Sequence, residues 1–211
     1  MRFTNRKKAG QLLAKKLEHY RDQDPIVYAL PRGGVVLAAE IARHIGADLD
    51  LVITRKIGHP AEPEYAIAAI TEDGSMVTNP QEISEVGKVW LEHQKKAEMQ
   101  EAKRRRQLYM KGKPHKNAKS KIAIIVDDGI ATGFTMRAAV IKLKKQEPKK
   151  IVVAVPVTPR STADTLRREA DEVIALDIPS DYGYLGAVGA YYDEFYQVSD
   201  KQVIEILSGF K

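Results

Sequence analysis

The sequence predicts an α/β fold built on a doubly wound, mostly parallel sheet. The main observation is an alternation of short apolar runs rich in β-branched residues with segments whose apolar residues recur at helical spacing. A second observation is that two apolar runs, 26–30 and 122–126, end directly in glycine-containing turns that open helices. Strands alternating with helices form parallel sheets, whose ligands bind beyond the carboxyl ends of the strands.

Composition limits the class of protein. The 211 residues are 44% hydrophobic and 29% charged, which suits one ordinary globular core, so we expect a single domain over residues 1–211. No apolar run approaches the roughly 18 residues of a membrane helix, and the first residues do not form a signal sequence. We therefore expect a cytoplasmic protein with no membrane partner. The absence of cysteine excludes disulfides, thiol nucleophiles and cysteine-bound metals.

The first fifty residues predict two helices around one strand. Leu13, Leu17 and Tyr20 share a face of a helix over residues 6–21, with Thr4 or Asn5 as its N-cap. A strand over 26–30 leads through the turn 31–34 into a helix that ends at Gly46. The two glycines of this turn alone would suit a tight βα connection. Arg32, at the end of a parallel strand, adds an anion contact.

Residues 49–54 predict the next strand, and the loop after it carries Arg55 and Lys56. This loop, 55–64, contains two prolines and a glycine. Two interpretations remain open: a mobile segment that brings cations to the site, or a solvated loop with incidental charge. Residues 66–71 and 76–78 predict a hairpin.

Residues 80–121 predict a helical insertion that is strongly basic in its second part. Between residues 88 and 121, 12 lysines and arginines stand against three glutamates, although the whole chain has a net charge of only +6. A solvated helix face explains this composition most simply. Contact with RNA or DNA through residues 103–106 is the sharper, less favoured interpretation, because such contact needs clustered cations.

The stretch 122–135 predicts an anion site with two acids beside it. A buried strand over 122–126 ends in Asp127 and Asp128, and a helix follows from about residue 136. In the connecting loop, Thr132, Gly133 and Thr135 direct hydroxyls, backbone amides and a helix N-terminus to one place, which favours a phosphate. The two acids would repel that phosphate, so they should bind hydroxyl groups or a cation.

The last third predicts strands over 151–155 and 173–176, with a helix between them that a capping box at Ser161 and Asp164 would begin. Residues 178–211 form an aromatic-rich flap that closes with a short helix around Val203 and Leu207. Most of its aromatic rings should pack in the core, and one of them is expected to stack on a planar ligand.

Three other protein classes with acids at a strand end fit less well. A P-loop NTPase is excluded because no Gly-x-x-x-x-Gly-Lys-Ser/Thr motif occurs. A response-regulator receiver would match Asp127, Asp128 and Asp177, but too few strands follow, and the first 120 residues would stay unexplained. A serine hydrolase is excluded because this sequence has no Gly-x-Ser-x-Gly motif. The five histidines show no metal-ligand spacing.

Residues 126–135 resemble the binding loop for phosphoribosyl pyrophosphate in the type I phosphoribosyltransferases. Residues 30–34, Leu-Pro-Arg-Gly-Gly, are similar to the family's pyrophosphate loop, and Arg55-Lys56 stands where the family's flexible loop begins with cations. These matches span most of residues 26–156 apart from the insertion. The resemblance implies the type I phosphoribosyltransferase fold, with a small hood beside the sheet, and the chain looks most like predicted members whose acceptor is unknown.

The resemblance implies a magnesium-dependent transfer of the phosphoribosyl group to a nitrogenous acceptor, with release of pyrophosphate. Asp127 and Asp128 would hold the ribose hydroxyls, directly or through magnesium-bound water. Residues 131–135 would hold the ribose phosphate. Arg32 with the Gly33 amide would hold the pyrophosphate, which Arg55 or Lys56 would neutralise as it leaves. The catalytic candidates are therefore Arg32, Arg55, Lys56, Asp127 and Asp128; the substrate-binding candidates are Pro31, Arg32, Gly33, Gly34, Asp127, Asp128, Gly129, Ala131, Thr132, Gly133, Phe134, Thr135 and Tyr182.

The tail is similar to the base-binding end of the hypoxanthine-guanine enzymes, with Tyr182 where an aromatic ring stacks on the purine. Two base-reading groups of those enzymes are absent, because Ala131 replaces an aspartate and Pro156 a lysine. The resemblance therefore does not identify the acceptor. It allows a homodimer without requiring one. The alternative function is a catalytically silent regulator that senses a nucleotide and binds RNA or DNA through the basic insertion.

Overall fold

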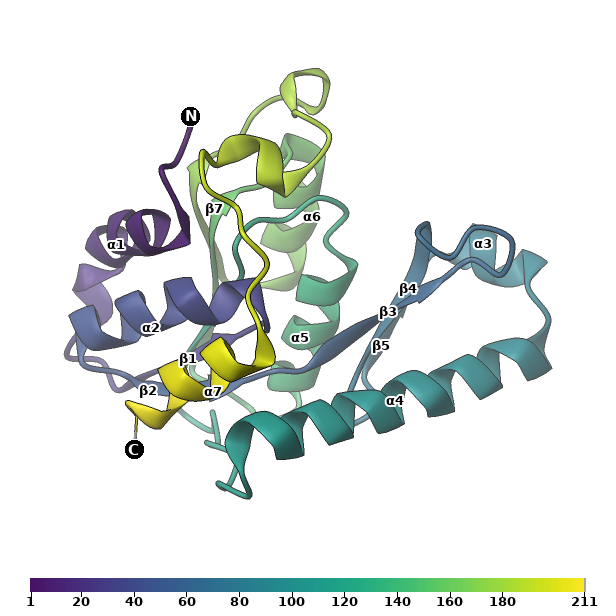
Figure 1. The fold of residues 1–211 in the computed structure, drawn as a ribbon, viewed down its shortest axis with the longest axis horizontal. Coiled ribbons are helices and arrows are strands. Elements are labelled where there is room, and N and C mark those ends of the chain that lie inside the picture. Colours follow the sequence, from purple (N-terminus) through teal and green to yellow (C-terminus); the bar gives the residue numbers. More distant parts are fainter. Residues whose placement is uncertain (211) are drawn as a thin grey trace.

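The computed structural model describes residues 1–210 and confirms the parallel sheet (Figure 1). Five strands lie in the order β2-β1-β6-β7-β8 and pair in parallel. Their bounds are β1 (Pro25–Ala29), β2 (Asp48–Leu51), β6 (Ile122–Val126), β7 (Lys150–Val157) and β8 (Glu172–Asp177). One face is covered by α1 (Arg6–Lys16), α2 (Gly33–Ile45) and α7 (Asp200–Ser208), and the other by α5 (Phe134–Lys144) and α6 (Arg160–Glu169).

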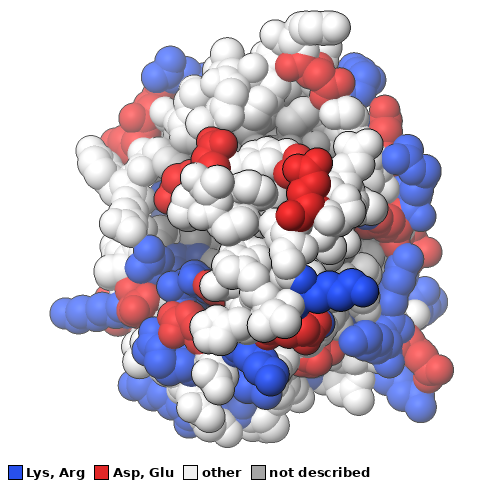
Figure 2. All heavy atoms as spheres, turned by 90° about the vertical axis from the view of Figure 1, so that its right-hand side faces the viewer, with Lys and Arg blue, Asp and Glu red and all other residues white. Residues whose placement is uncertain are grey.

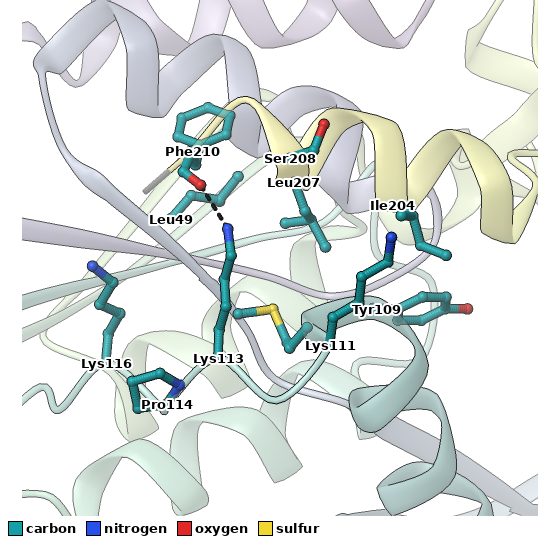
Figure 3. A pocket seen from close by; sticks show the side chains of 11 residues that line it. Leu49, Tyr109, Lys111, Lys113, Pro114, Lys116, Ile204, Leu207, Ser208 and Phe210 are labelled. Carbon is teal, nitrogen blue, oxygen red and sulfur yellow. Dashed lines mark hydrogen bonds between the residues drawn. The ribbon is translucent and has the colours of Figure 1, made fainter.

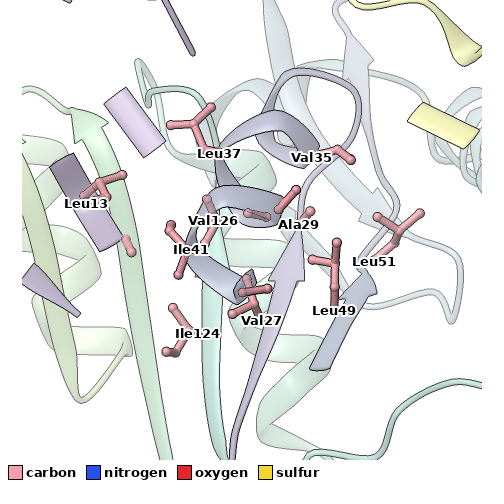
Figure 4. Close-up of a cluster of buried hydrophobic side chains, with 14 of the residues drawn as sticks. Leu13, Val27, Ala29, Val35, Leu37, Ile41, Leu49, Leu51, Ile124 and Val126 are labelled. Atoms are coloured by element: carbon pink, nitrogen blue, oxygen red, sulfur yellow. The ribbon is translucent and has the colours of Figure 1, made fainter. Parts of the chain in front are cut away.

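The central strands are apolar throughout because both of their faces are buried. In β6, Ile124 and Val126 pack into the cluster under α1 and α2 (Figure 4), whereas Ala123 and Ile125 pack into the cluster under α5 and α6. Each strand is therefore a continuous apolar run rather than an alternating one. Truncating one of these isoleucines to alanine typically costs about 2–5 kcal/mol.

A second, antiparallel sheet forms a hood beside the main sheet (Figure 1). It contains β3 (Thr54–Gly58), β4 (Ala66–Thr71) and β5 (Met76–Thr78), followed by α3 (Pro80–Glu85) and α4 (Lys88–Met110). The predicted hairpin is confirmed as β4 and β5. The predictions of one strand over 49–54 and of a loop from residue 55 are wrong, because β2 ends at Leu51 and β3 begins at Thr54. The chain crosses between the two sheets at Val52 and Ile53, both buried, so the apolar run continues through a break that periodicity does not reveal.

Helix α4 is packed rather than solvated along its second half. Ala102, Arg106 and Tyr109 are buried. Arg106 donates to Asp50 Oδ1 and to the Leu51 carbonyl oxygen, each at 2.7 Å, so a buried charge pair joins the insertion to β2. The cluster predicted for nucleic acid is therefore not a common solvent-facing surface. Seen from the hood side, lysines and arginines are interspersed with acidic side chains (Figure 2).

The helix ends were predicted with mixed success. Asn5 caps α1 as expected, but this helix ends at Lys16, and a 3-10 helix over Glu18–Tyr20 follows. Gly46 ends α2 with a φ of 67°, as predicted. The capping box at Ser161 is wrong, because α6 begins at Arg160 and the Ser161 hydroxyl donates to Asp181 instead. Two more 3-10 helices, Asp181–Gly183 and Val188–Tyr191, precede α7. Within residues 1–210, no helix is long and apolar enough to cross a membrane.

Candidate functional site

The register of the central strands brings the two glycine-containing turns together. Ala29 in β1 pairs with Val126 in β6, so the chain leaves both strands at the same level. A cavity of about 430 Å³ opens at this edge. Its walls come from the turn after β1, the start of β3, helix α4, the loop after β6 and the C-terminal segment: Leu30, Pro31, Thr54, Arg55, Lys56, Arg105, Asp127, Asp128, Gly129, Ile130, Ala131, Thr132, Gly133, Thr135 and Val188.

The acidic wall of the cavity is held by buried contacts. The Asp128 amide donates to Asp127 Oδ1 at 2.8 Å, and Arg6 Nε donates to Asp128 Oδ2 at 2.7 Å. The Arg6 and Asp128 side chains are only 12% and 15% exposed. The Tyr192 hydroxyl donates to the Asp128 carbonyl oxygen at 2.6 Å. Arg6 also stacks on Phe195 and donates to the Tyr196 carbonyl oxygen, so the aromatic tail closes over this wall.

The two carboxyl groups are electrostatically strained when both are ionised. Burial raises the pKa of Asp127 well above its usual range, and the neighbouring Asp128 charge adds to the shift. Burial also raises the pKa of Asp128, although Arg6 opposes that rise. A ligand that brings hydroxyl donors or a cation to the pair would relieve this strain. The donor set suits Mg²⁺, which is usually held by one or two carboxylates together with water and substrate phosphates.

Gly33 and Gly34 allow the start of α2 to approach the acidic pair. A Cβ atom at Gly33 would lie 1.9 Å from Asp128 Oδ2, and one at Gly34 would lie 2.7 Å from the Val126 carbonyl oxygen. The first contact involves a side chain, but the second involves backbone of the central strand. Any other residue at Gly34 must therefore displace either α2 or β6.

The loop after β6 presents an anion-binding geometry. Gly133, with a φ of 80°, is the N-cap of α5, and no side chain caps this helix. Thr132 and Thr135 line the same cavity, and the Thr162 hydroxyl fixes the loop by donating to the Ala131 carbonyl oxygen at 2.8 Å. The amides of the first helical turn are therefore available to a phosphate in the cavity.

A cationic wall faces the acidic pair from the hood and α4. Arg55 and Lys56 in β3 and Arg105 in α4 all line the cavity. Arg55 Nε is 2.7 Å from Glu98 Oε2, and Arg105 Nε is 2.8 Å from Glu101 Oε1, so glutamates of α4 hold both guanidinium groups. Hydrogen bonds from Arg104 and Arg105 lower the pKa of Glu101 to about 2, which keeps its carboxylate ionised. The side chains of these two ion pairs are 22–29% exposed, so a more highly charged anion in the cavity can replace the glutamates.

Most of the predicted site residues line this one cavity, and four groups of them do not. The Arg32 side chain points to α7, where its Nη1 is 3.6 Å from Asp200 Oδ1, and its peptide bond with Pro31 is cis. Gly33 and Gly34 lie behind the acidic pair. Phe134, the first residue of α5, packs in a cluster with hood strands β4 and β5. Tyr182 is fully exposed, and its ring does not line the cavity.

Sequence reasoning missed three residues of the site: Arg6, Arg105 and Tyr192. Arg6 and Tyr192 reach Asp128 from the two ends of the chain, and nothing local in the sequence connects them with it. Arg105 carried a usable signal, because Glu101 stands one helical turn before it and the next residue, Arg106, takes the buried side of the helix.

Comparison with known proteins gives one consistent result. Residues 4–192 match the model of the phosphoribosyl transferase domain. The chain is 36% identical over 207 residues to "Putative phosphoribosyl transferase MT0597" of Mycobacterium tuberculosis, covering 97% of this chain and 46% of that protein. It thus spans about half the length of the curated relatives it matches.

Solved structures share the fold of this chain. The crystal structure of TT1426 from Thermus thermophilus is 39% identical, with a TM-score of 0.83 over 100% of this chain and 99% of that one. The AQ2163 protein from Aquifex aeolicus shares the fold alone, at 12% identity and a TM-score of 0.53 over 85% of this chain and 78% of that one. The chain is a member of the type I phosphoribosyltransferase family.

Proposed function

We propose that the protein transfers the phosphoribosyl group of phosphoribosyl pyrophosphate to a nitrogenous acceptor, with Mg²⁺ bound at Asp127 and Asp128. The observation that carries the proposal is the pairing of an acidic and a cationic wall on one cavity. Phosphoribosyl pyrophosphate has the complementary parts: a diol for the acids, a phosphate for the start of α5, and a diphosphate for the arginines and Lys56.

The reaction is a displacement at the anomeric carbon. A bond forms from the acceptor nitrogen to this carbon, the bond from the carbon to the pyrophosphate oxygen breaks, and the acceptor loses a proton. Positive charge develops on the ribose near Asp127 and Asp128, and negative charge develops on the pyrophosphate. Bound Mg²⁺ would supply further stabilisation of the leaving group. Arg55, Lys56 and Arg105 would stabilise the same charge from the opposite wall.

The resident ion pairs of the cationic wall support this assignment. Glu98 and Glu101 form ion pairs with Arg55 and Arg105. A pyrophosphate carries more charge than either carboxylate and offers several acceptor oxygens, so it competes well for both guanidinium groups. Arg55 of the hood and Arg105 of α4 would then contact the pyrophosphate in place of the two glutamates.

The acceptor is a compound other than hypoxanthine or guanine. Ala131 lines the cavity without a polar group to read a purine nitrogen, and Tyr182 stands in solvent. A screen of nitrogenous bases and amines for release of pyrophosphate would identify the acceptor class.

Calorimetric titration with phosphoribosyl pyrophosphate in the presence of Mg²⁺ tests the donor site. We expect saturable binding that depends on Mg²⁺ and on Asp128. No heat of binding at millimolar ligand would overturn the proposal. Inorganic pyrophosphate with Mg²⁺ serves as a second probe, because it reports on the cationic wall without needing the ribose contacts.

A further inference from the structure

A second cavity lies away from the acidic pair, between the C-terminal end of α4 and α7 (Figure 3). Its volume is about 360 Å³, within the range of small-molecule sites. Leu49, Tyr109, Met110 and Leu207 contribute to its wall, and all four are buried parts of the main core cluster. The cavity is therefore built on a rigid apolar base rather than on surface side chains alone.

The charged side chains that line this cavity are all basic. Lys111, Lys113 and Lys116 line it, and no acidic side chain does. Lys113 Nζ donates to the Phe210 carbonyl oxygen at 2.8 Å, and Lys116 Nζ is 3.0 Å from Asp48 Oδ1. Lys111 has no ion-pair partner within residues 1–210. An anionic group at the mouth would thus find cations whose present contacts are exposed and weak.

We infer that this cavity binds a small apolar molecule carrying one anionic group, of the fatty or aryl carboxylate class. The apolar wall would cover the hydrocarbon part, and removal of that part from water would supply most of the affinity. The lysines would orient the carboxylate toward solvent at the mouth. A neutral molecule of the same shape would fill the cavity but form no ion pair with the three lysines.

The cavity is connected to the candidate active site through α7. The Tyr109 ring forms part of its wall, and the Tyr109 hydroxyl donates to Asp200 Oδ1 at 2.6 Å. Asp200 is the first residue of α7, and the same Oδ1 is 3.6 Å from Arg32 Nη1 in the turn after β1. An occupant that displaces the Tyr109 ring or α7 would change the contact between Asp200 and Arg32, and through it the turn after β1, where the neighbouring Pro31 lines the candidate active site. This coupling, unlike the binding itself, rests on the proposed function.

Titration of the whole chain with decanoate, kept below its micelle-forming concentration, tests the binding. We expect saturable one-to-one binding, weakened about tenfold when decanol replaces decanoate, because about 1.4 kcal/mol of ion pairing is lost. The double variant Lys111→Gln/Lys113→Gln should show a similar loss. The matched control Lys15→Gln/Lys16→Gln removes the same charge from exposed positions on α1 and should bind normally.

The inference would be overturned by a lack of saturable binding, by equal affinity for decanoate and decanol, or by equal affinity in the two double variants. Ile204→Trp, which fills the cavity, should abolish binding, and retained binding would place the ligand elsewhere. Because decanoate binding needs no phosphoribosyl pyrophosphate, failure of the proposed function leaves this test intact.

The coupling is tested by the Mg²⁺-pyrophosphate affinity measured with and without saturating decanoate. We expect a severalfold change in the natural protein and none in Tyr109→Phe, which keeps the ring in the wall but removes the hydroxyl bond to Asp200. An unchanged affinity in the natural protein would contradict the connection through α7.

Discussion

The two walls of the cavity are stabilised in different ways. The acidic wall is buried, and its contacts come from the central sheet, Arg6 and Tyr192. The cationic wall comes from the hood and α4, and its two arginines are held by partly exposed ion pairs with Glu98 and Glu101. If the proposed function holds, the first wall is preorganised for its ligand, whereas the arginines of the second wall must leave their glutamates before they can bind. A substitution on the acidic wall should therefore weaken ligand binding more than a substitution on the cationic wall.

The cationic wall also shows that neighbouring charges in a helix can have separate functions. Arg104 is exposed, Arg105 lines the cavity, and Arg106 is buried against Asp50. Each step along the helix turns the side chain by about 100°, so the three consecutive arginines point to solvent, to the cavity and to the core.

The largest expected effect concerns stability. Arg106→Met leaves Asp50, which is 1% exposed, without its guanidinium partner. Removing one member of a buried pair costs about 3–5 kcal/mol. Urea unfolding should show this loss, and Arg104→Ala should stay within about 0.5 kcal/mol of the natural protein. Equal stabilities of the two variants would mean that α4 does not depend on the buried pair.

The next effect separates the two walls. Asp128→Asn removes an ionised hydrogen-bond acceptor, typically about 1.5–3 kcal/mol, so binding of phosphoribosyl pyrophosphate with Mg²⁺ should weaken roughly 10–150-fold. Arg104→Ala should leave that affinity unchanged. Calorimetry of both variants measures the contrast, and equal affinities would refute the site assignment.

A smaller loss is expected on the cationic wall. Arg105→Ala should weaken Mg²⁺-pyrophosphate binding about five- to tenfold, or about 1–1.4 kcal/mol, because the bond gained with the ligand replaces one already made with Glu101. Arg104→Ala is the matched control, since it also loses a bond to Glu101 but does not reach the cavity. If Arg104→Ala weakened binding as much, Glu101 rather than Arg105 would be the important group.

The smallest effect is a pH dependence of stability without ligand. The pKa of Asp127 is raised on folding, so the folded protein holds this proton more tightly than the unfolded chain does. Stability contributed by this group should therefore fall as pH rises from its ordinary pKa of 3.8 through the raised value. Asp127→Asn should remove that loss, raising the melting temperature at neutral pH by about 2–4 °C per kcal/mol gained. Thermal melts across the pH range would reveal it.

A control exists for that measurement. Asp181 is exposed, and its hydrogen bonds with Ser161 lower its pKa, so Asp181→Asn should not reproduce the stabilisation. A melting temperature that rises with pH in the natural protein, and not in Asp127→Asn, would contradict the sign of the effect.

The sheet and the acidic wall could be predicted from sequence because their signals are local. Apolar runs such as 122–126 are buried on both faces, and the turns that follow them carry Asp127, Asp128 and Gly133 within a few residues. The break at Val52 and Ile53 could not be predicted, since both residues are buried and continue the apolar run of β2. Arg6 and Tyr192 could not be predicted for a different reason: they contact Asp128 from distant parts of the chain, and such contacts leave no periodic pattern in the sequence.

The close approach at Gly34 has a consequence for the range of sequences this fold accepts. The backbone of β6 occupies the space that any side chain there would need, so a saturation library selected for folded protein should return glycine almost alone at this position. Gly87, at the start of α4, has an ordinary φ of −65°, and a Cβ atom added there would meet no other atom within 4 Å, so the same library should return many residues there. Counting survivors at these two glycines would distinguish a packing constraint from a merely permissive turn.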